Sequence, residues 1–159
     1  MELEKYWHPN VNWYGPAGIG TGRGISGFRH WHQIPFLRAM PDRKGGSSNE
    51  KLAFEGMEDL QTHWVHEGNY VCETGWPIMR LTITNDGWMG IARSKKPLEM
   101  RSLDFWRVEN GLIRENWVLI DLLDIYRQIN VDVFNRIKEF NKAKNIGKIN
   151  LTDGLNVIK

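Results

Sequence analysis

The chain has 159 residues, of which 41% are hydrophobic and 25% are charged, and its formal net charge is +2 at pH 7. This length suits a single domain, and the composition is that of a globular protein, which excludes a disordered or collagen-like chain. Eight tryptophans are unusual for this length and indicate either an aromatic-lined pocket or simply a Trp-rich core.

Cys72 is the only cysteine, so no intramolecular disulfide can form, which is typical of a reducing compartment. Residues 1–7 include Glu2, Glu4 and Lys5 and lack the apolar core of a signal peptide. No run of 18 apolar residues is present to span a bilayer. We therefore expect a cytoplasmic protein without a membrane partner.

The carboxyl-terminal end of the chain is basic. From Arg136 onward six Lys or Arg residues face only Glu139 and Asp153. Without interleaved aromatic residues this pattern is more typical of a solvated terminus than of a nucleic-acid site, so no nucleic-acid partner is expected. We predict one domain over residues 1–144 and a flexible or peripheral basic tail over residues 145–159.

The first third of the chain predicts short elements. Residues 3–7 have the spacing of a short helix that stops before Pro9, and residues 11–14 read as a strand. Residues 15–24 are too rich in glycine for regular structure. Residues 25–40 have helical spacing, with Pro35 expected to kink or split the helix. The apolar positions that give this spacing are Phe28, Trp31, Ile34 and Leu37.

The rest of the chain predicts a loop at residues 41–50, then strands, then helices. Extended patterns cover residues 61–66, 70–84, 99–109 and 112–121, and helical patterns cover residues 122–130 and 133–143. Asn110-Gly111 is a strong signal for a two-residue hairpin turn. Consecutive strands between terminal helices predict an α+β fold in which a curved antiparallel sheet packs on helices around one pocket.

The predicted hairpin fixes a register in which the positions of paired residues sum to 221. Because side chains alternate between faces, Asp104 would then lie opposite Trp117 on a mixed aromatic and polar face that suits a pocket wall. This face would carry Met100, Ser102, Asp104, Trp106, Glu115, Trp117, Leu119 and Asp121, and the other face would carry Leu103, Phe105, Val118 and Ile120.

Asp121 and Asp104 are the candidate acid–base residues. In this register they lie roughly 13 Å apart along the sheet, so each would act alone. A carboxylate in a dry aromatic pocket has a raised pKa and can accept and donate a proton near neutral pH. For Asp121 the alternative is an N-cap of the following helix, and for Asp104 it is a buried hydrogen bond to an indole or backbone N–H.

Other motifs favour no cofactor and no metal. Gly22 to Gly27 match G-x-G-x-x-G but lack the βαβ context of a dinucleotide site. The pairs His30/His32 and His63/His66 each point in different directions, so neither pair can chelate a metal by itself. Either His30 or His32 could reach the pocket as a hydrogen-bond donor, although surface positions are commoner.

Several stretches together resemble a known family. They are His8–Pro16, Arg23–Phe28, Pro35–Asp42, Gly75–Pro77, Met100–Arg107 and Glu115–Leu123, and they cover most of residues 5–135. The chain resembles the SnoaL-like polyketide cyclases, also called ester cyclases, within the nuclear-transport-factor-like superfamily of cone-shaped α+β barrels. The most specific part is Trp117-x-x-x-Asp121 after an R-V-x-N-G-x-I hairpin. The opening helix is shorter than the family's usual start, as in the second half of a tandem-domain member.

The resemblance implies a cofactor-free enzyme in which an aspartate at position 121 moves a proton during an aldol-type ring closure. We therefore expect a lyase or isomerase acting on a hydrophobic carbonyl compound, with Asp121 as base and then acid. Asp104 or His32 would orient a substrate oxygen. The residues expected to line the cavity are Trp13, Phe28, Phe36, Trp106 and Trp117. The alternative is a non-catalytic small-molecule-binding or dimerisation module in which Asp121 only caps a helix. By analogy, a homodimer through the outer face of the sheet is expected for either.

Overall fold

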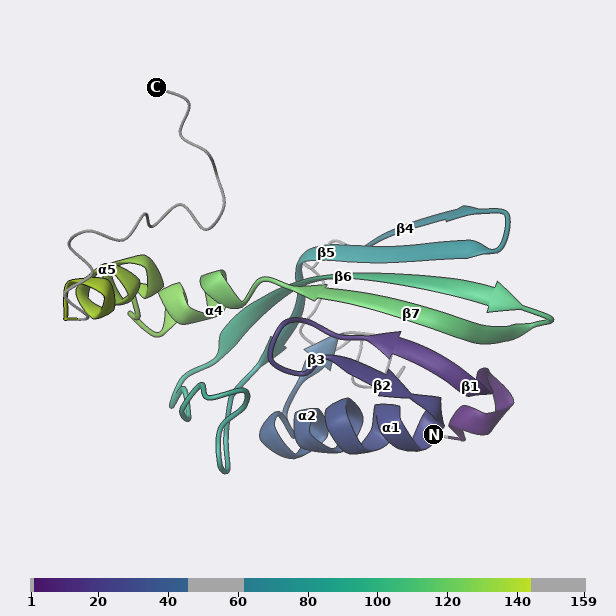
Figure 1. Ribbon diagram of the computed structural model, residues 1–159, viewed down its shortest axis with the longest axis horizontal. Helices are drawn as coiled ribbons and strands as arrows, with labels where there is room; N and C mark the ends of the chain where they lie inside the picture. The colour runs from purple at the N-terminus through teal and green to yellow at the C-terminus, as the bar shows by residue number, and fades with distance from the viewer. Residues whose placement is uncertain (1, 46–61, 144–159) are drawn as a thin grey trace, which may run out of the picture.

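The computed structural model describes residues 2–45 and 62–143 (Figure 1). Its elements, in chain order, are the 3-10 helix η1 (Leu3–Lys5), β1 (Trp7–Tyr14), β2 (Thr21–Arg23), α1 (Gly24–Phe28), the π-helix η2 (Arg29–Gln33), α2 (Ile34–Ala39), β3 (Lys44–Gly45), β4 (Thr62–Glu67), β5 (Tyr70–Leu81), β6 (Leu98–Glu109), β7 (Leu112–Ile120), α4 (Leu122–Gln128) and α5 (Val133–Ala143). Two predicted segments lie outside the described residues. They are residues 46–50 of the expected 41–50 loop and the predicted basic tail, residues 145–159.

The strands form one curved, unclosed sheet in the order β2-β1-β7-β6-β5-β3, with β4 also paired to β5. This confirms the predicted α+β class. One pairing differs from the expected antiparallel sheet, because β1 runs parallel to β7. These two strands are far apart in the sequence, so no hairpin forces them to be antiparallel. Helices α1 and α2 lie beside β1 and β2, whereas α4 and α5 extend from the far end of the sheet (Figure 1).

The β6–β7 hairpin has the predicted turn but not the predicted register. Asn110 and Gly111 both have positive φ, which a two-residue hairpin turn of type I′ requires, and Glu109 pairs with Leu112 as expected. The register then shifts, because Val108 pairs with Ile113 whereas Arg107 pairs with Glu115. Arg114 is therefore the extra residue of a β-bulge.

The bulge exchanges the two faces of β7 relative to β6. Asp104 pairs with Val118, and Trp117 pairs with Phe105. The predicted pairing of Asp104 with Trp117 is therefore wrong, because one inserted residue moves every later side chain of β7 to the opposite face. Val118 and Ile120, expected on the other face, share the face of Asp104.

The segment 24–39 is helical throughout, but its inner face is not the predicted one. Trp31 and Ile34 are both 59% exposed, whereas Phe28 and Phe36 are buried. The π-helical segment before Pro35 has more residues per turn than an α-helix, so side chains four residues apart stay in line. The inner row is therefore Phe28, His32 and Phe36 rather than the predicted row of spacing three.

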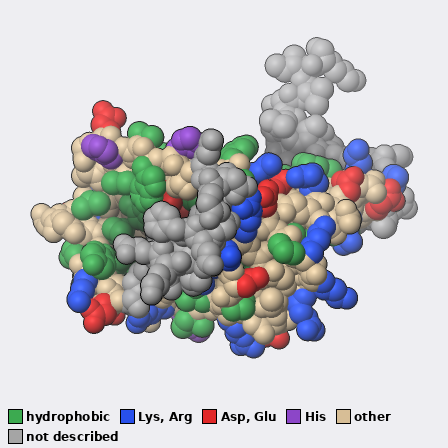
Figure 2. Space-filling view, turned by 180° about the vertical axis from the view of Figure 1, so that it is seen from behind, with side chains coloured by type: hydrophobic (Ala, Val, Ile, Leu, Met, Phe, Trp, Pro, Cys, Tyr) green, Lys and Arg blue, Asp and Glu red, His purple; other side chains and the backbone are tan. Residues whose placement is uncertain are grey.

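Two clusters of buried side chains hold the sheet and helices together. The larger contains Met40, Ile83, Leu98, Met100 and Ile125 among others, and the smaller contains Leu3, Trp13 and Phe28. Figure 2, which shows the molecule from behind, has hydrophobic side chains gathered toward the end formed by the long strands, and Lys and Arg more numerous toward α4 and α5. No helix in the described ranges is long and apolar enough to cross a membrane.

Candidate functional site

A cavity of about 450 Å³ lies between the inner face of the sheet and the helical segment 24–39. Strands β1, β5, β6 and β7 supply one wall, and α1, η2 and α2 supply the other. Its lining residues are Leu3, Trp7, Trp13, Phe28, Arg29, His32, Gln33, Phe36, Leu37, Arg43, Glu73, Ile78, Met79, Ser102, Asp104, Trp106, Asn116, Val118 and Ile120. Small-molecule sites in proteins are commonly about 300–1,000 Å³, so the cavity has the size of one.

Aromatic rings form much of the cavity wall. The imidazole of His32 stacks on the indole of Trp13 with ring centroids 4.3 Å apart and planes 16° apart. Phe28 and Phe36 lie 5.4 Å and 5.2 Å from the same imidazole. Trp106, from the β6 wall, stacks on Trp64 of β4 at 5.9 Å. The structure therefore places Trp13, Phe28, Phe36 and Trp106 around the cavity.

Asp104 is the predicted acid–base residue that faces the cavity. Its Oδ2 accepts a hydrogen bond from the Ser102 hydroxyl at 3.0 Å, and its Oδ1 accepts one from the Asn116 side-chain amide at 3.3 Å. Burial raises the pKa of Asp104 above 3.8, and these two hydrogen bonds oppose that rise. A carboxylate that is desolvated but held by two donors has a fixed direction and increased basicity.

Glu73 is a second carboxyl group in this cavity, and the sequence analysis missed it. It lies on β5 directly opposite Asp104 on β6, and only 5% of the residue is exposed. Burial, and then the charge of Asp104, raise the pKa of Glu73 from 4.5 to about 7. The signal that could have found it is the β5–β6 register, but the long connection between those strands does not fix this register from the sequence.

His32 is the histidine that reaches the cavity, whereas His30 is exposed. Burial lowers the pKa of His32 from 6.5 to about 4, so the ring is neutral near neutral pH. Its Nδ1 is buried and has no hydrogen-bond partner among the described residues. A buried imidazole nitrogen without a partner is able to bind a polar group of a ligand.

Asp121 lies outside this cavity. Its Oδ1 accepts a hydrogen bond from the backbone N–H of Asp124 at 3.0 Å, so it is the N-cap of α4. Its Oδ2 lies 3.7 Å from Nη1 of Arg101, and 32% of the side chain is exposed. The expected position of Asp121 in the dry, ring-lined cavity is therefore wrong, because the bulge at Arg114 places the end of β7 in the other register.

Trp117 is displaced from the predicted site by the same bulge. It stacks on Tyr14 at 5.6 Å on the outer face of the sheet and does not line the cavity. Asp121 instead borders a second hollow, of about 700 Å³, together with Arg101, Arg127 and Phe134.

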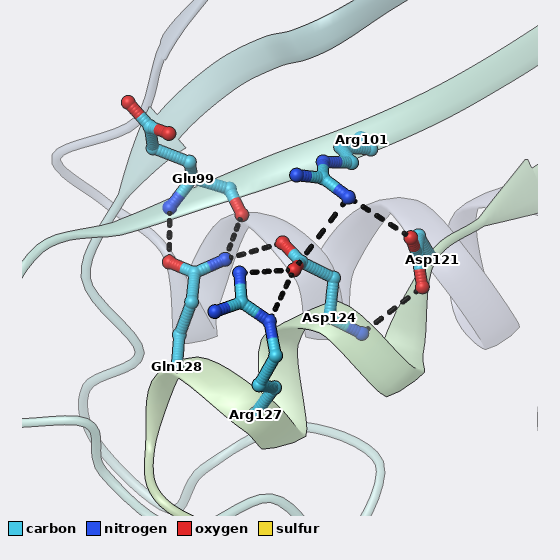
Figure 3. A network of polar contacts seen from close by, with 6 residues as sticks. All are labelled: Glu99, Arg101, Asp121, Asp124, Arg127 and Gln128. Carbon is cyan, nitrogen blue, oxygen red and sulfur yellow. Dashed lines mark hydrogen bonds and ion pairs between the residues drawn. The ribbon is translucent and has the colours of Figure 1, made fainter.

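The surroundings of Asp121 join α4 to β6 (Figure 3). Asp124 is only 7% exposed and accepts hydrogen bonds from Arg127 and Gln128. The Gln128 side chain also donates to the backbone oxygen of Glu99 and accepts from its N–H. The polar groups of this network are paired with one another, which is the pattern of a structural contact rather than of a reaction site.

The sequence model of the SnoaL-like polyketide cyclases matches residues 43–129, which is more than half of the chain. This chain belongs to the SnoaL-like polyketide cyclase family. No curated protein matches the sequence. Family membership supports a cyclase- or isomerase-type role on a small molecule.

Solved structures share the fold of this SnoaL-like chain. A protein described as a SnoaL-like polyketide cyclase from Jannaschia sp. CCS1 has 15% identity and a TM-score of 0.58, and the match covers 82% of this chain and 77% of that one. IdmH from Streptomyces antibioticus, described as a polyketide cyclase, has 21% identity and a TM-score of 0.57 over 81% and 85%. An NTF2-like protein of unknown function from Burkholderia pseudomallei K96243 has 18% identity and a TM-score of 0.53 over 80% and 81%.

The SnoaL-like match spans both cavity carboxyl groups, Glu73 and Asp104, as well as the helix cap Asp121. Within the described ranges, no three His, Cys, Asp or Glu side chains are grouped as ligands for a metal ion. The polar groups that the cavity offers a small molecule are two carboxyl groups, a neutral imidazole, two side-chain amides, a hydroxyl and the guanidinium groups of Arg29 and Arg43.

Proposed function

We propose that this chain is a cofactor-free enzyme of the cyclase or isomerase type that transfers protons on a hydrophobic carbonyl compound, with Asp104 as its base. The observation that carries the proposal is a buried carboxylate, held by Ser102 and Asn116, in a cavity lined by aromatic rings. The family match supports the reaction class, and the position of Asp104 in the cavity, with Asp121 capping α4 outside it, supports Asp104 as the base.

The proposed reaction begins when Asp104 takes a proton from a carbon next to a carbonyl group. The electron pair of that C–H bond then forms a C–C bond to a second carbonyl carbon of the same molecule. The oxygen of the second carbonyl receives the proton from Asp104, which returns to its ionised form. Atoms and electrons balance in this aldol-type closure, so the reaction class needs no oxidant or reductant.

The cavity walls are proposed to bind the apolar part of the substrate. Trp13, Phe28, Phe36 and Trp106 offer ring faces and edges on which a planar hydrophobic molecule can stack. The neutral imidazole of His32 would accept or donate a hydrogen bond to a substrate oxygen. Excluding water from this space strengthens the interaction of the substrate with the polar groups of Asp104 and His32.

Exchange of carbon-bound protons tests the proposal without knowledge of the natural substrate. The probe is 2-tetralone, a bicyclic ketone with acidic protons beside its carbonyl, followed in D₂O by proton NMR. We expect the wild-type protein to accelerate the exchange and Asp104→Asn to lose at least about 100-fold of that rate, as is usual for an acid–base residue. Asp121→Asn is the matched control, and we expect it to retain the wild-type rate.

Two results would contradict the proposal. The first is wild-type exchange no faster than in buffer, and the second is an Asp104→Asn rate equal to the wild-type rate. A folded Asp104→Asn chain is recognised by an unchanged pattern of backbone amide signals.

A non-catalytic binding module is the second candidate, and the capping role of Asp121 favours it. Such a module would bind 2-tetralone, detected by quenching of tryptophan fluorescence, without accelerating exchange. Binding with exchange supports the enzyme, and binding without exchange supports the module.

We also propose that a second copy of this chain covers the outer face of the sheet. One largely apolar row crosses this face, in which each residue pairs with the next on the neighbouring strand. The row runs from Val65 of β4 through Cys72 of β5 and Phe105 of β6 to Trp117 of β7. Leu103 and Leu119 form the neighbouring pair. Phe105 is 41% exposed and Leu119 is 63% exposed, so no described helix covers them.

A copy of the same chain suits this row because a twofold interface is self-complementary. Contiguous apolar patches beyond a few hundred Å² are rare on monomers. The charged neighbours Arg107 and Glu115 are hydrogen-bonded to each other, which limits like-charge repulsion between two such faces.

The cytoplasmic location inferred from the single cysteine stays a prediction.

A further inference from the structure

We infer that Glu73 is a second catalytic residue of the cavity, giving its proton to the substrate carbonyl oxygen while Asp104 takes the proton from the neighbouring carbon. This inference rests on the proposed function, because it assigns a partner to Asp104 in the same reaction. It also predicts an ionisation that can be measured without any substrate.

The strand register places the two carboxyl groups side by side. Glu73 and Asp104 are directly opposite in the antiparallel β5–β6 pair, and both line the cavity. Side chains opposite each other in such a pair have Cβ atoms roughly 4.5–5.5 Å apart. A carbonyl oxygen and the carbon next to the carbonyl group are separated by only two bonds. One substrate can therefore contact both carboxyl groups at once.

The hydrogen bonds around the pair assign the proton to Glu73. Asp104 accepts from Ser102 and from Asn116, and such donors favour an ionised carboxylate. Glu73 is 5% exposed, and burial and the charge of Asp104, rather than any hydrogen bond from a described residue, account for its raised pKa. A carboxyl group that is buried without donors favours its neutral form. At neutral pH one member of the pair is therefore a base and the other an acid.

The other charged or titratable groups around Glu73 do not replace it as the donor. His32, on the helical wall, is neutral, and its pKa is lowered to about 4. Nη1 of Arg29 lies 3.7 Å from Oε1 of Glu4, and the guanidinium group of Arg43 lies over the ring of Phe36. On β4 the residue paired with Glu73 is the uncharged Trp64. The neighbouring residue on β5, Cys72, pairs with the outer-face residue Phe105, and burial, followed by the charges of Asp104 and Glu73, raises the pKa of its thiol.

Proton and electron counts balance for the paired step. The C–H bond beside the carbonyl breaks and its proton joins Asp104, while its electron pair becomes the C=C bond of an enol. The carbonyl oxygen takes the proton of Glu73, whose O–H electron pair stays on the carboxylate. After the enol carbon has attacked a second carbonyl, the enol proton returns to Glu73, and Asp104 protonates the new alkoxide. Both groups recover their starting states.

The test combines exchange of 2-tetralone with direct titration of the carboxyl groups. We expect wild-type exchange to fall as pH rises through about 7, because Glu73 then loses the proton that it donates. Glu73→Gln should be slower by about 100-fold at slightly acid pH and should lack this fall. Glu73→Asp, which keeps a proton donor, should recover part of the rate and the alkaline fall. Glu67→Gln on the exposed strand β4 is the matched control.

Carbon-13 NMR of the glutamate carboxyl groups supplies the readout without substrate. In the full chain we expect one glutamate signal, absent in Glu73→Gln, to titrate near neutral pH. Because the charge of Asp104 raises this pKa, the same signal should titrate at lower pH in Asp104→Asn. Amide spectra of each variant show that the chain remains folded.

The outcomes separate this inference from the proposed function. If Asp104→Asn is inactive but Glu73→Gln retains the wild-type rate and alkaline fall, the role of Glu73 is overturned and Asp104 stands. If Asp104→Asn keeps the wild-type rate, the proposed function is overturned. A Glu73 signal that titrates in the ordinary range of exposed glutamates overturns the inference whatever the exchange rates.

Discussion

Burial of Glu73 makes the stability of the folded chain depend on pH. The pKa of this carboxyl group is about 7 in the folded chain and 4.5 when unperturbed. The unfolded chain therefore loses its proton first as pH rises, and the free energy of unfolding falls between about pH 4.5 and about pH 7. At about 1.4 kcal/mol for each pKa unit, the fall is on the order of 3 kcal/mol.

Glu73→Gln should remove this fall, because an amide carries no proton that titrates in this range. Between about pH 5 and about pH 8 the free energy of unfolding of the wild type should fall by on the order of 3 kcal/mol more than that of the variant. Urea unfolding followed by tryptophan fluorescence measures the difference. Equal pH dependence in the two chains would show that Glu73 ionises normally, and Glu67→Gln reports any general effect of removing an acid.

His32 acts on stability in the opposite direction over an overlapping pH range. Its pKa is about 4 in the folded chain and 6.5 when unperturbed, so the unfolded chain gains the proton first as pH falls. The stability associated with the neutral ring is present above about pH 6.5 and is lost as pH falls toward about 4. Because the two contributions oppose each other between about pH 4.5 and about pH 6.5, the difference between wild type and Glu73→Gln reports Glu73, whereas the wild-type curve alone does not.

At the scale of elements, Asp121 begins helix α4. Its side chain accepts from the N–H of Asp124, and loss of such a cap costs about 1 kcal/mol. We expect Asp121→Ala to lower the free energy of unfolding by about this amount and Asp121→Asn to lower it much less, because asparagine is also a good N-cap. Urea unfolding at neutral pH measures both variants. Equal destabilisation by the two substitutions would contradict the capping role.

The β6–β7 hairpin shows what local sequence signals determine. Asn110-Gly111 fixes the turn because both residues must adopt positive φ, and that part was predicted. The bulge at Arg114 has no comparable signal, because it arises from the way β7 pairs with both β6 and β1. One unpredicted residue was enough to move Trp117 and Asp121 from the cavity face to the outer face.

The helical segment 24–39 illustrates the same limit. Helical spacing predicted that a helix forms, but the π-helical turn before Pro35 changed which residues face the sheet. His32 and Phe36 line the cavity, and the spacing alone did not decide between His30 and His32. Trp31 is exposed although it fitted the predicted apolar row.

For the whole molecule, the fold class was predicted from consecutive strand patterns that are separated by turn signals and flanked by terminal helices. The parallel pairing of β1 with β7 was not, because it joins two strands that are far apart in the sequence and depends on packing. Glu73 was missed for the same reason. Its contact with Asp104 depends on the pairing of β5 with β6, which a long connection leaves undetermined.

The outer face of the sheet predicts the assembly state of the molecule. We expect a homodimer in sedimentation velocity at micromolar concentration, because the row through Phe105 and the neighbouring Leu119 leave apolar surface exposed. Leu119→Lys should shift the equilibrium to monomer, since two like charges would face each other across a twofold contact. Ile34→Lys on α2 introduces the same charge at a residue that is 59% exposed, against 63% for Leu119, but lies on the helical side. Ile34→Lys should therefore leave the dimer intact. A monomeric wild type would exclude this face as the interface, and so would equal dissociation of the dimer by both substitutions.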